Sequence, residues 1–324
     1  MKCEPIRLWE PEEYTYPLAL GYSPDMVPYL HEESDPRPCI LVVPGGGYTN
    51  VSPSEGELVA KRFYEAGFQT FVCSYTTNPL YAQPLMNQPM QDLARAIRLL
   101  RSRPEVFRID PDKIVVCGFS AGAHLCASVC VHSDEIPDAR YGRVSPRPDA
   151  AILSYPVITS GPAAHPGSFQ ALLGRDIFRR EDPQAAQLLH YHSIEQHVTR
   201  HTPPCFLWQT LEDQTVPVEN SLLMANALHR QGVRFAYHLF SQGPHGLSLA
   251  NEDWAEHRFG DTHCFDQTQR ILDAVRSGTL PLPEDEKAIL LDKFAKAAVS
   301  RGTPNAEVMV WPQLAIAWLH EVLG

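Results

Sequence analysis

A serine flanked by glycines follows a short apolar run and could act as a nucleophile. The run is Ile114–Cys117, and Ser120 lies at the centre of the Gly-Phe-Ser-Ala-Gly stretch over Gly118–Gly122. A strand that turns abruptly into a helix strains its central residue, and only glycine or another small residue fits on either side. The spacing therefore predicts that Ser120 stands at the carboxyl end of a strand, where its hydroxyl could attack an acyl carbonyl.

Two residues farther along the chain could activate this serine. His245 lies in a glycine-flanked loop after the last predicted strand, and could take the proton of Ser120 during attack and return it to the leaving group. Asp213 follows the apolar run Cys205–Gln209 and could hold the imidazole in the required tautomer. Its neighbour Glu212 is the alternative acid, and the residue types alone leave both open.

Glycines also follow the apolar run Ile40–Val43, which reads as another strand. Pro44 is followed by three consecutive glycines, which are entropically costly and favour a loop that approaches a ligand closely over an ordinary turn. The backbone N–H groups of Gly46, Gly47 and Ala121 are the predicted oxyanion-hole donors, which would bind the charge that develops on the attacked carbonyl.

Loops at the carboxyl edge of the sheet are expected to select the substrate. Tyr48 lies beside the glycine loop, and Tyr155 and Pro156 follow the strand after the nucleophile. These three residues are the predicted substrate contacts, with simple packing at the rim as the alternative for Tyr48. His124, one turn beyond Ser120, is expected to pack within its helix.

Strands and helices alternate along the chain, which predicts the α/β class with a doubly wound, mostly parallel sheet flanked by helices. The predicted strands are Ile40–Val43, Thr70–Ser74, Ile114–Cys117, Ala150–Leu153, Cys205–Gln209 and Phe235–Phe240. The predicted helices are Glu55–Glu65, Met90–Arg101, Ala121–Val131 and Glu219–Arg230. Residues 1–35 are expected to form an arm or leading antiparallel strands, and residues 36–324 one catalytic domain.

Taken together, the motifs resemble those of α/β-hydrolase-fold carboxylesterases, in particular bacterial acetyl esterases and acetylxylan esterases, including bifunctional acetylxylan and feruloyl esterases. Serine, acid and histidine occur in the chain order of that fold. The resemblance covers roughly residues 36–249 and resumes near the C-terminus. Its further motifs are Ile109–Ile114, Ser154–Ile158, Leu172–Gly174, Thr202–Pro204, Gly243–Leu247 and Trp311–Leu319.

The resemblance carries several expectations. It favours Asp213 over Glu212, because the Asp-x-x-Val-Pro pattern through Val216 and Pro217 matches the family. It implies hydrolysis of small acyl esters, often acetyl groups on plant cell-wall sugars, with no metal and no organic cofactor. The expected function is thus a serine carboxylic-ester hydrolase. An amide hydrolase of formamidase or peptidase type, and a non-catalytic binding protein on the same fold, are the alternatives.

The segment 251–308 departs from shorter members of this group and is predicted as a helical insertion before the last helix. Within it, Glu284–Val299 has apolar residues at helical spacing between charged ones. An amphipathic helix needs a surface to cover, so it could form a lid, extend the core or make a homodimer contact.

Composition limits the classes of partner that the protein is expected to bind. The 324 residues are 44% hydrophobic and carry a formal net charge of −11, which disfavours nucleic acid and anionic membranes as partners. A small-molecule or oligosaccharide acyl ester is the expected partner. The N-terminus lacks the apolar stretch of a secretory signal, and the eight cysteines form no C-x-x-C pair, so a cytoplasmic location with reduced thiols is expected.

A group of four histidines offers a competing metal interpretation. The group comprises His190, His192, His197 and His201, and the last two would share one face of a helix. Two prolines follow directly and no acidic ligand completes the set, so these histidines are expected to line a loop and to bind no metal.

Overall fold

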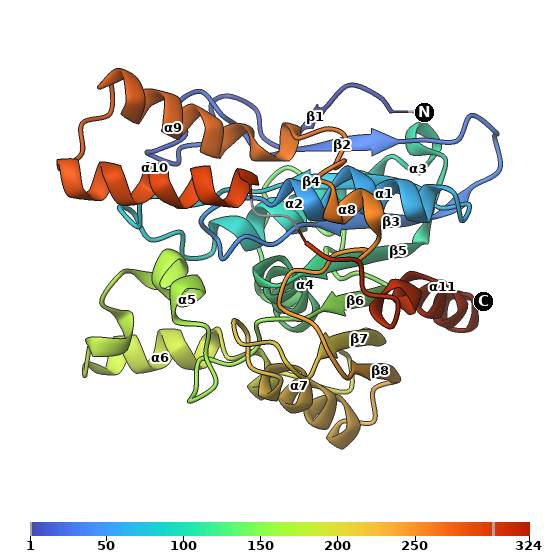
Figure 1. Cartoon of the computed structure of the whole chain (residues 1–324). Helices are drawn as coiled ribbons and strands as arrows, with labels where there is room; N and C mark the ends of the chain where they lie inside the picture. Colours follow the sequence, from blue (N-terminus) through green and yellow to red (C-terminus); the bar gives the residue numbers. More distant parts are fainter. Residues whose placement is uncertain (1, 300–301) are drawn as a thin grey trace.

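An eight-stranded sheet forms the centre of the computed structural model, which describes residues 2–299 and 302–324, with the backbone alone at 297–299 (Figure 1). The order is β1-β2-β4-β3-β5-β6-β7-β8; β2 runs antiparallel to β1 and β4, and all pairs from β4 to β8 are parallel. The strands are β1 Ile6–Arg7, β2 Asp25–Tyr29, β3 Arg37–Val43, β4 Gln69–Ser74, β5 Ile109–Phe119, β6 Ala150–Ser154, β7 Cys205–Thr210 and β8 Phe235–Phe240.

The predicted fold class is confirmed, and all six predicted strands lie in the sheet. β5 begins at Ile109, five residues before the predicted start, because Ile109 pairs with Arg37 ahead of an irregularity in the register between β3 and β5. For residues 1–35, the structure shows the leading antiparallel strands, β1 and β2.

Helices cover both faces of the sheet. In Figure 1, α1 and α11 lie in front of the sheet and contact each other, whereas α2 and α4 lie behind it and contact each other. The α-helices are α1 Glu57–Tyr64, α2 Gln88–Ser102, α3 Pro104–Phe107, α4 Ala121–His132, α5 Pro166–Leu173, α6 Pro183–Tyr191, α7 Glu219–Arg230, α8 Glu252–Ala255, α9 Asp266–Ser277, α10 Glu284–Val299 and α11 Trp311–Leu323. Short 3₁₀ helices are η1 Pro53–Glu55, η2 Ser133–Glu135, η3 Ile177–Arg179, η4 Ile194–Gln196, η5 His263–Phe265 and η6 Val308–Val310.

Helices α5 and α6 were not predicted, although each has a recognisable start. The side chain of His165 caps α5 by accepting from Ser168 N, and that of Asp182 caps α6 by accepting from Ala185 N. Proline follows each cap at the first helical position, where its missing N–H costs nothing and its fixed φ suits the helix. The cap followed by proline was the available signal.

The predicted insertion is helical and packs on the rest of the chain. α9 and α10 share a small apolar core with Leu80, a residue of the loop after β4. In the same loop, the backbone and hydroxyl of Thr77 bond with the buried amide of Gln267 at 2.8–3.0 Å. Of the predicted roles for α10, the described side chains thus show an extension of the core. Residues 300 and 301 of the insertion lie outside the described residues.

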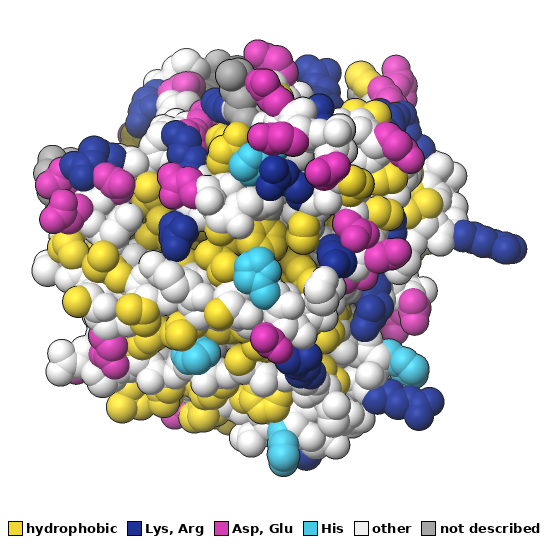
Figure 2. All heavy atoms as spheres, turned by 90° about the vertical axis from the view of Figure 1, so that its right-hand side faces the viewer, with side chains coloured by type: hydrophobic (Ala, Val, Ile, Leu, Met, Phe, Trp, Pro, Cys, Tyr) yellow, Lys and Arg dark blue, Asp and Glu magenta, His cyan; other side chains and the backbone are white. Residues whose placement is uncertain are grey.

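The parallel strands end at two opposite edges of the sheet, and different elements lie at each edge. The carboxyl ends face the side on which α5, α6, α9 and α10 lie, at the left of Figure 1. Figure 2 shows the opposite edge, where Lys and Arg side chains are scattered among Asp and Glu and no continuous basic area appears among the described residues. A nucleic-acid backbone requires such an area, but the absence of a nucleic-acid partner stays a prediction.

Candidate active site

Ser120 occupies a strained turn between β5 and α4, as its flanking glycines predict. Its backbone has φ 51° and ψ −119°. A Cβ at Gly118 would lie 2.6 Å from Ala123 Cα, and one at Gly122 would lie 2.2 Å from Val43 O. Only glycine permits these approaches. The second one brings the end of β3, and with it the glycine loop, directly against the turn that holds Ser120.

Ser120, His245 and Asp213 form a hydrogen-bonded chain. The Ser120 hydroxyl lies 2.8 Å from His245 Nε2, and His245 Nδ1 lies 2.7 Å from Asp213 Oδ2. The three residues come from the ends of β5, β8 and β7, which are separated in sequence but meet at the carboxyl edge of the sheet. This is the arrangement of a nucleophile, a base and an orienting acid.

Asp213 is fixed by its own hydrogen bonds. Its Oδ1 accepts from Thr215 N and Val216 N, both at 2.9 Å, and its side chain is fully buried. A carboxylate held in this way keeps Oδ2 aimed at His245. Glu212, the alternative acid, points elsewhere and accepts from Gly243 N at 3.2 Å. The structure therefore pairs the histidine with Asp213.

The glycine loop presents free backbone donors next to Ser120. Gly46 and Gly47 have positive φ values of 125° and 64°. Among the described residues, no hydrogen bond occupies the N–H groups of Gly46, Gly47 or Ala121, whereas Gly45 N donates to Glu55. The three predicted oxyanion donors therefore remain available, and their catalytic role stays a prediction.

Glu55 is a buried carboxyl beneath the site that sequence reasoning missed. Its Oε2 accepts from Gly45 N at 2.7 Å and its Oε1 from the Tyr155 hydroxyl at 2.7 Å. The same hydroxyl accepts from Ser248 N, three residues after His245. Burial raises the pKa of Glu55, while hydrogen bonds from Tyr155 and Gly45 oppose the rise. This network connects the glycine loop, Gly45–Gly47, to the loop that holds His245 and Ser248, here called the histidine loop. The sequence pattern around Glu55 does not distinguish it from an ordinary glutamate at the start of a helix.

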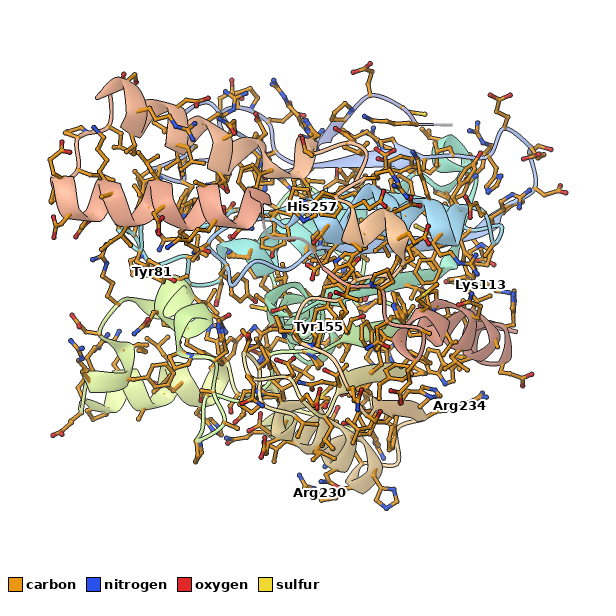
Figure 3. The ribbon with its side chains drawn as sticks, in the orientation of Figure 1. Tyr81, Lys113, Tyr155, Arg230, Arg234 and His257 are labelled. Atoms are coloured by element: carbon orange, nitrogen blue, oxygen red, sulfur yellow. The ribbon has the colours of Figure 1, made fainter. Side chains whose placement is uncertain are left out.

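The three predicted substrate contacts need correction. Tyr48, Tyr155 and Pro156 are all buried, and Tyr155 (labelled in Figure 3) packs edge-on against the His245 ring, with centroids 4.9 Å apart. The Tyr48 hydroxyl bonds His124 Nδ1 at 2.7 Å. The Tyr48 and Tyr155 hydroxyls are already bonded within the protein, so these two rings support the loops from below, and Pro156 packs beside them as a buried apolar residue.

His124 packs within the protein, as expected. Its Nε2 lies 2.9 Å from the carbonyl of His192, so this nitrogen carries the proton and Nδ1 accepts from Tyr48. Burial lowers the pKa of His124 to about 4, which keeps the ring neutral at pH 7.

We expect acid to destabilise the protein through this histidine. The unfolded chain binds a proton at His124 near pH 6.5 and the folded chain only near pH 4, so the free energy of unfolding falls as the pH drops through this range. About 3 kcal/mol is lost by pH 4, and the loss is complete only below the pKa of the folded state. Urea unfolding at pH 7, 6, 5 and 4 measures it. The His124→Gln variant should show a shallower fall than the wild type, and parallel curves would contradict the assignment.

The four histidines are not arranged as a metal-binding group in the part of the chain that the structure describes, and the absence of a metal stays a prediction. η4 ends at Gln196, His197 lies in a bend and His201 in a separate turn, so the two do not share a helical face, which corrects that prediction. His192 is buried, which lowers its pKa to about 3, so the predicted loop-surface position is wrong for this residue. No described group of three His, Cys, Asp or Glu side chains could hold a metal ion.

None of the described helices is long and apolar enough to cross a membrane.

Sequence comparisons point to esterases. A family model described as BD-FAE matches residues 27–228, more than half of the chain. The chain is 44% identical over 270 residues to endo-1,4-beta-xylanase B of Butyrivibrio fibrisolvens, covering 83% of this chain and 41% of that protein. It is 28% identical over 242 residues to an acetylxylan esterase of Xylanibacter ruminicola, covering 74% and 46%. The chain thus spans less than half the length of these two curated relatives.

Structural comparisons agree. The acetyl ester-xyloside bifunctional hydrolase from Caldicellulosiruptor lactoaceticus matches with a TM-score of 0.69 and 40% identity, over 79% of this chain and 94% of that one. A carboxylesterase from Lactobacillus plantarum matches with a TM-score of 0.63 and 25% identity, over 92% of both chains. From the family model and the 40% identical structure it follows that the chain belongs to the BD-FAE family and is an α/β-hydrolase of the esterase type.

Proposed function

We propose that the protein is a serine carboxylesterase that removes short acyl groups, acetyl above all, from a carbohydrate or another small alcohol. The observation that carries the proposal is the pair of hydrogen bonds that joins Ser120 to His245 and His245 to Asp213, at 2.8 and 2.7 Å. The names of the relatives, which include an acetylxylan esterase and an acetyl ester-xyloside hydrolase, support the choice of acyl group and alcohol.

In the proposed reaction, Ser120 Oγ attacks the ester carbonyl while His245 Nε2 takes its proton. The oxyanion that forms accepts hydrogen bonds from Ala121 N and the glycine-loop donors. When the intermediate collapses, the imidazolium gives its proton to the alcohol oxygen and leaves an acyl group on Ser120. A water that loses its proton to His245 then attacks this acyl-enzyme, and collapse of the second intermediate releases the acid and restores the hydroxyl.

Asp213 keeps its charge throughout this cycle. Its hydrogen bond to Nδ1 holds the imidazole with Nε2 free to accept from Ser120, and its charge stabilises the imidazolium once formed. The strained turn at Ser120 contributes by holding Oγ at the edge of the sheet, where a carbonyl can approach it.

The test is a comparison of esters and amides under one set of conditions. We expect p-nitrophenyl acetate to be hydrolysed faster than the butyrate and the octanoate, and acetate to be released from acetylated xylo-oligosaccharides. Faster hydrolysis of p-nitroacetanilide than of the acetate ester would favour an amide hydrolase instead. An enzyme that turns over none of these compounds would refute the proposal in favour of a binding role.

A further inference from the structure

A cavity of about 410 Å³ opens between α5 and α10. It lies between the loop after β4, the end of α5, and α10, and its wall includes Leu80, Tyr81, Arg175, Ile289 and Lys293. Figure 3 shows Tyr81 between the ribbons of α10 and α5. The volume falls within the range of about 300–1,000 Å³ that is typical of small-molecule sites.

Two contacts join this cavity to the proposed oxyanion hole. Lys293 Nζ, on α10, donates to Thr49 Oγ1 at 2.9 Å, and Thr49 Oγ1 bonds Gly46 O at 2.9 Å. On the other side, His165 lies outside the cavity wall but near Tyr81, since a Cβ on Gly167 would lie 3.6 Å from the Tyr81 hydroxyl and 3.9 Å from His165 Nε2; His165 Cε1 lies 3.8 Å from the position that a Cβ on Gly47 would take. A ligand whose ester carbonyl lies against the glycine loop could therefore extend toward the cavity past Lys293.

Hydrogen-bond donors without a partner gather at this place. The Nδ1 atom of His165 accepts from Ser168 N, which leaves the proton on Nε2. Burial above all, and then the neighbouring His245 and Lys293, lower the pKa of His165. Among the described residues, no hydrogen bond engages His165 Nε2 or the Tyr81 hydroxyl.

Lys293 carries the one cation in this wall that lacks an acidic partner among the described residues. Arg175 lies 3.3 Å from Glu286, and Arg179 lies 3.6 Å from Asp176. Lys293 is an exposed residue, and partial loss of hydration lowers the pKa of its ammonium group. Two of its three protons remain free after the bond to Thr49.

Apolar side chains complete the lining. Leu80 and Leu290 are buried members of the small core between α9 and α10, whereas Ile289 is 70% exposed. A sugar ring suits such a lining because its C–H groups can cover Ile289 while its hydroxyls accept from the donors. An aliphatic alcohol would leave those donors without partners, at a cost.

We propose that this cavity is a saccharide subsite for the alcohol part of the ester, in which Tyr81 and Lys293 of the cavity wall bind ring hydroxyls, joined by His165, which lies near Tyr81 outside the wall. The inference rests on the proposed function and assigns a role to the insertion, since α10 supplies one wall. It predicts that the enzyme distinguishes a glycosyl ester from an aryl ester by contacts beyond the scissile bond.

Kinetics of Lys293→Met and Tyr81→Phe test the subsite. We expect kcat/KM for acetylated xylotriose, divided by kcat/KM for p-nitrophenyl acetate, to fall about tenfold or more in Lys293→Met and several-fold in Tyr81→Phe, mainly through KM. Lys296→Met is the matched control, because Lys296 lies on the same helix, is 77% exposed and pairs with Asp292. Its ratio should equal that of the wild type. Equal ratios in all four enzymes would overturn the inference.

A binding measurement distinguishes failure of the saccharide subsite from failure of the esterase proposal. Calorimetry with non-acetylated xylotriose, which has the hydroxyls but no ester, should show binding that weakens about tenfold or more in Lys293→Met and is unchanged in Lys296→Met. Binding confined to a glucuronic acid-substituted xylotriose would replace the hydroxyl subsite by a carboxylate subsite and refute the inference. If ester hydrolysis is present but xylotriose does not bind, the subsite fails and the esterase proposal stands.

Discussion

Replacing Ser120 with alanine is expected to lower kcat for p-nitrophenyl acetate by a factor on the order of 10⁶. The change deletes only Oγ, the atom that lies 2.8 Å from His245 Nε2 and that would form the acyl-enzyme. Alanine keeps the Cβ and meets the same backbone strain at φ 51°, so the fold should be retained. Initial rates over a range of substrate concentrations, together with the midpoint of urea unfolding, give both quantities.

A second serine serves as the control for this experiment. Ser277 lies at the exposed end of α9, where its hydroxyl bonds Ala274 O and the neighbouring Thr279. Ser277→Ala should keep the kcat of the wild type. If Ser120→Ala also kept most of its activity while unfolding at the same urea concentration, hydrolysis would have to use another nucleophile, and the proposed mechanism would be wrong.

Replacing Asp213 with asparagine should lower kcat by about 10⁴-fold. The amide can still accept from Thr215 N and Val216 N through its oxygen, so the loop keeps its shape. The group that faces His245 Nδ1 then becomes an uncharged NH₂, which donates to the ring and favours the tautomer that cannot accept from Ser120. The wrong tautomer of His245 and the missing carboxylate charge both slow the same step, the transfer of the Ser120 proton to His245.

Glu212→Gln is the natural partner for this measurement, because the two acids are adjacent in sequence. The glutamine oxygen can still accept from Gly243 N, the contact that Glu212 makes. We expect its kcat to stay close to that of the wild type. The reverse result, in which Glu212→Gln loses activity and Asp213→Asn does not, would show that the acid acts from the neighbouring position and that the described pairing is not the working one.

Local patterns predicted the strands and the turn at Ser120 well. Buried parallel strands read as continuous apolar runs, and a serine between glycines marks a strand-to-helix turn whose close approaches exclude other residues. The helices α5 and α6 were missed because they are short, with 8 and 9 residues, and only a capping side chain followed by proline marks their starts. The boundary of β5 was wrong because strand length depends on pairing with β3, which no local pattern encodes.

In the site, too, local patterns predicted some features, while others depended on packing. Residue types and chain order identified Ser120, Asp213 and His245 as candidates, because a nucleophile, a base and an acid have distinctive chemistry. Burial could not be inferred in the same way, so Tyr48, Tyr155 and Pro156 were mistaken for substrate contacts. Aromatic residues near a loop look alike in sequence whether they face a ligand or pack beneath it.

By itself, the sequence determined the class of fold, the strand ends that meet at one edge and the chemistry that is available there, since these follow from local periodicity and residue type. Only the tertiary structure decided that His245 faces Asp213 and not Glu212, that Glu55 ties the glycine loop to the histidine loop, and that Lys293 of the insertion reaches Thr49. Each of these contacts joins residues far apart in the chain, and which partner a side chain meets depends on how the elements pack.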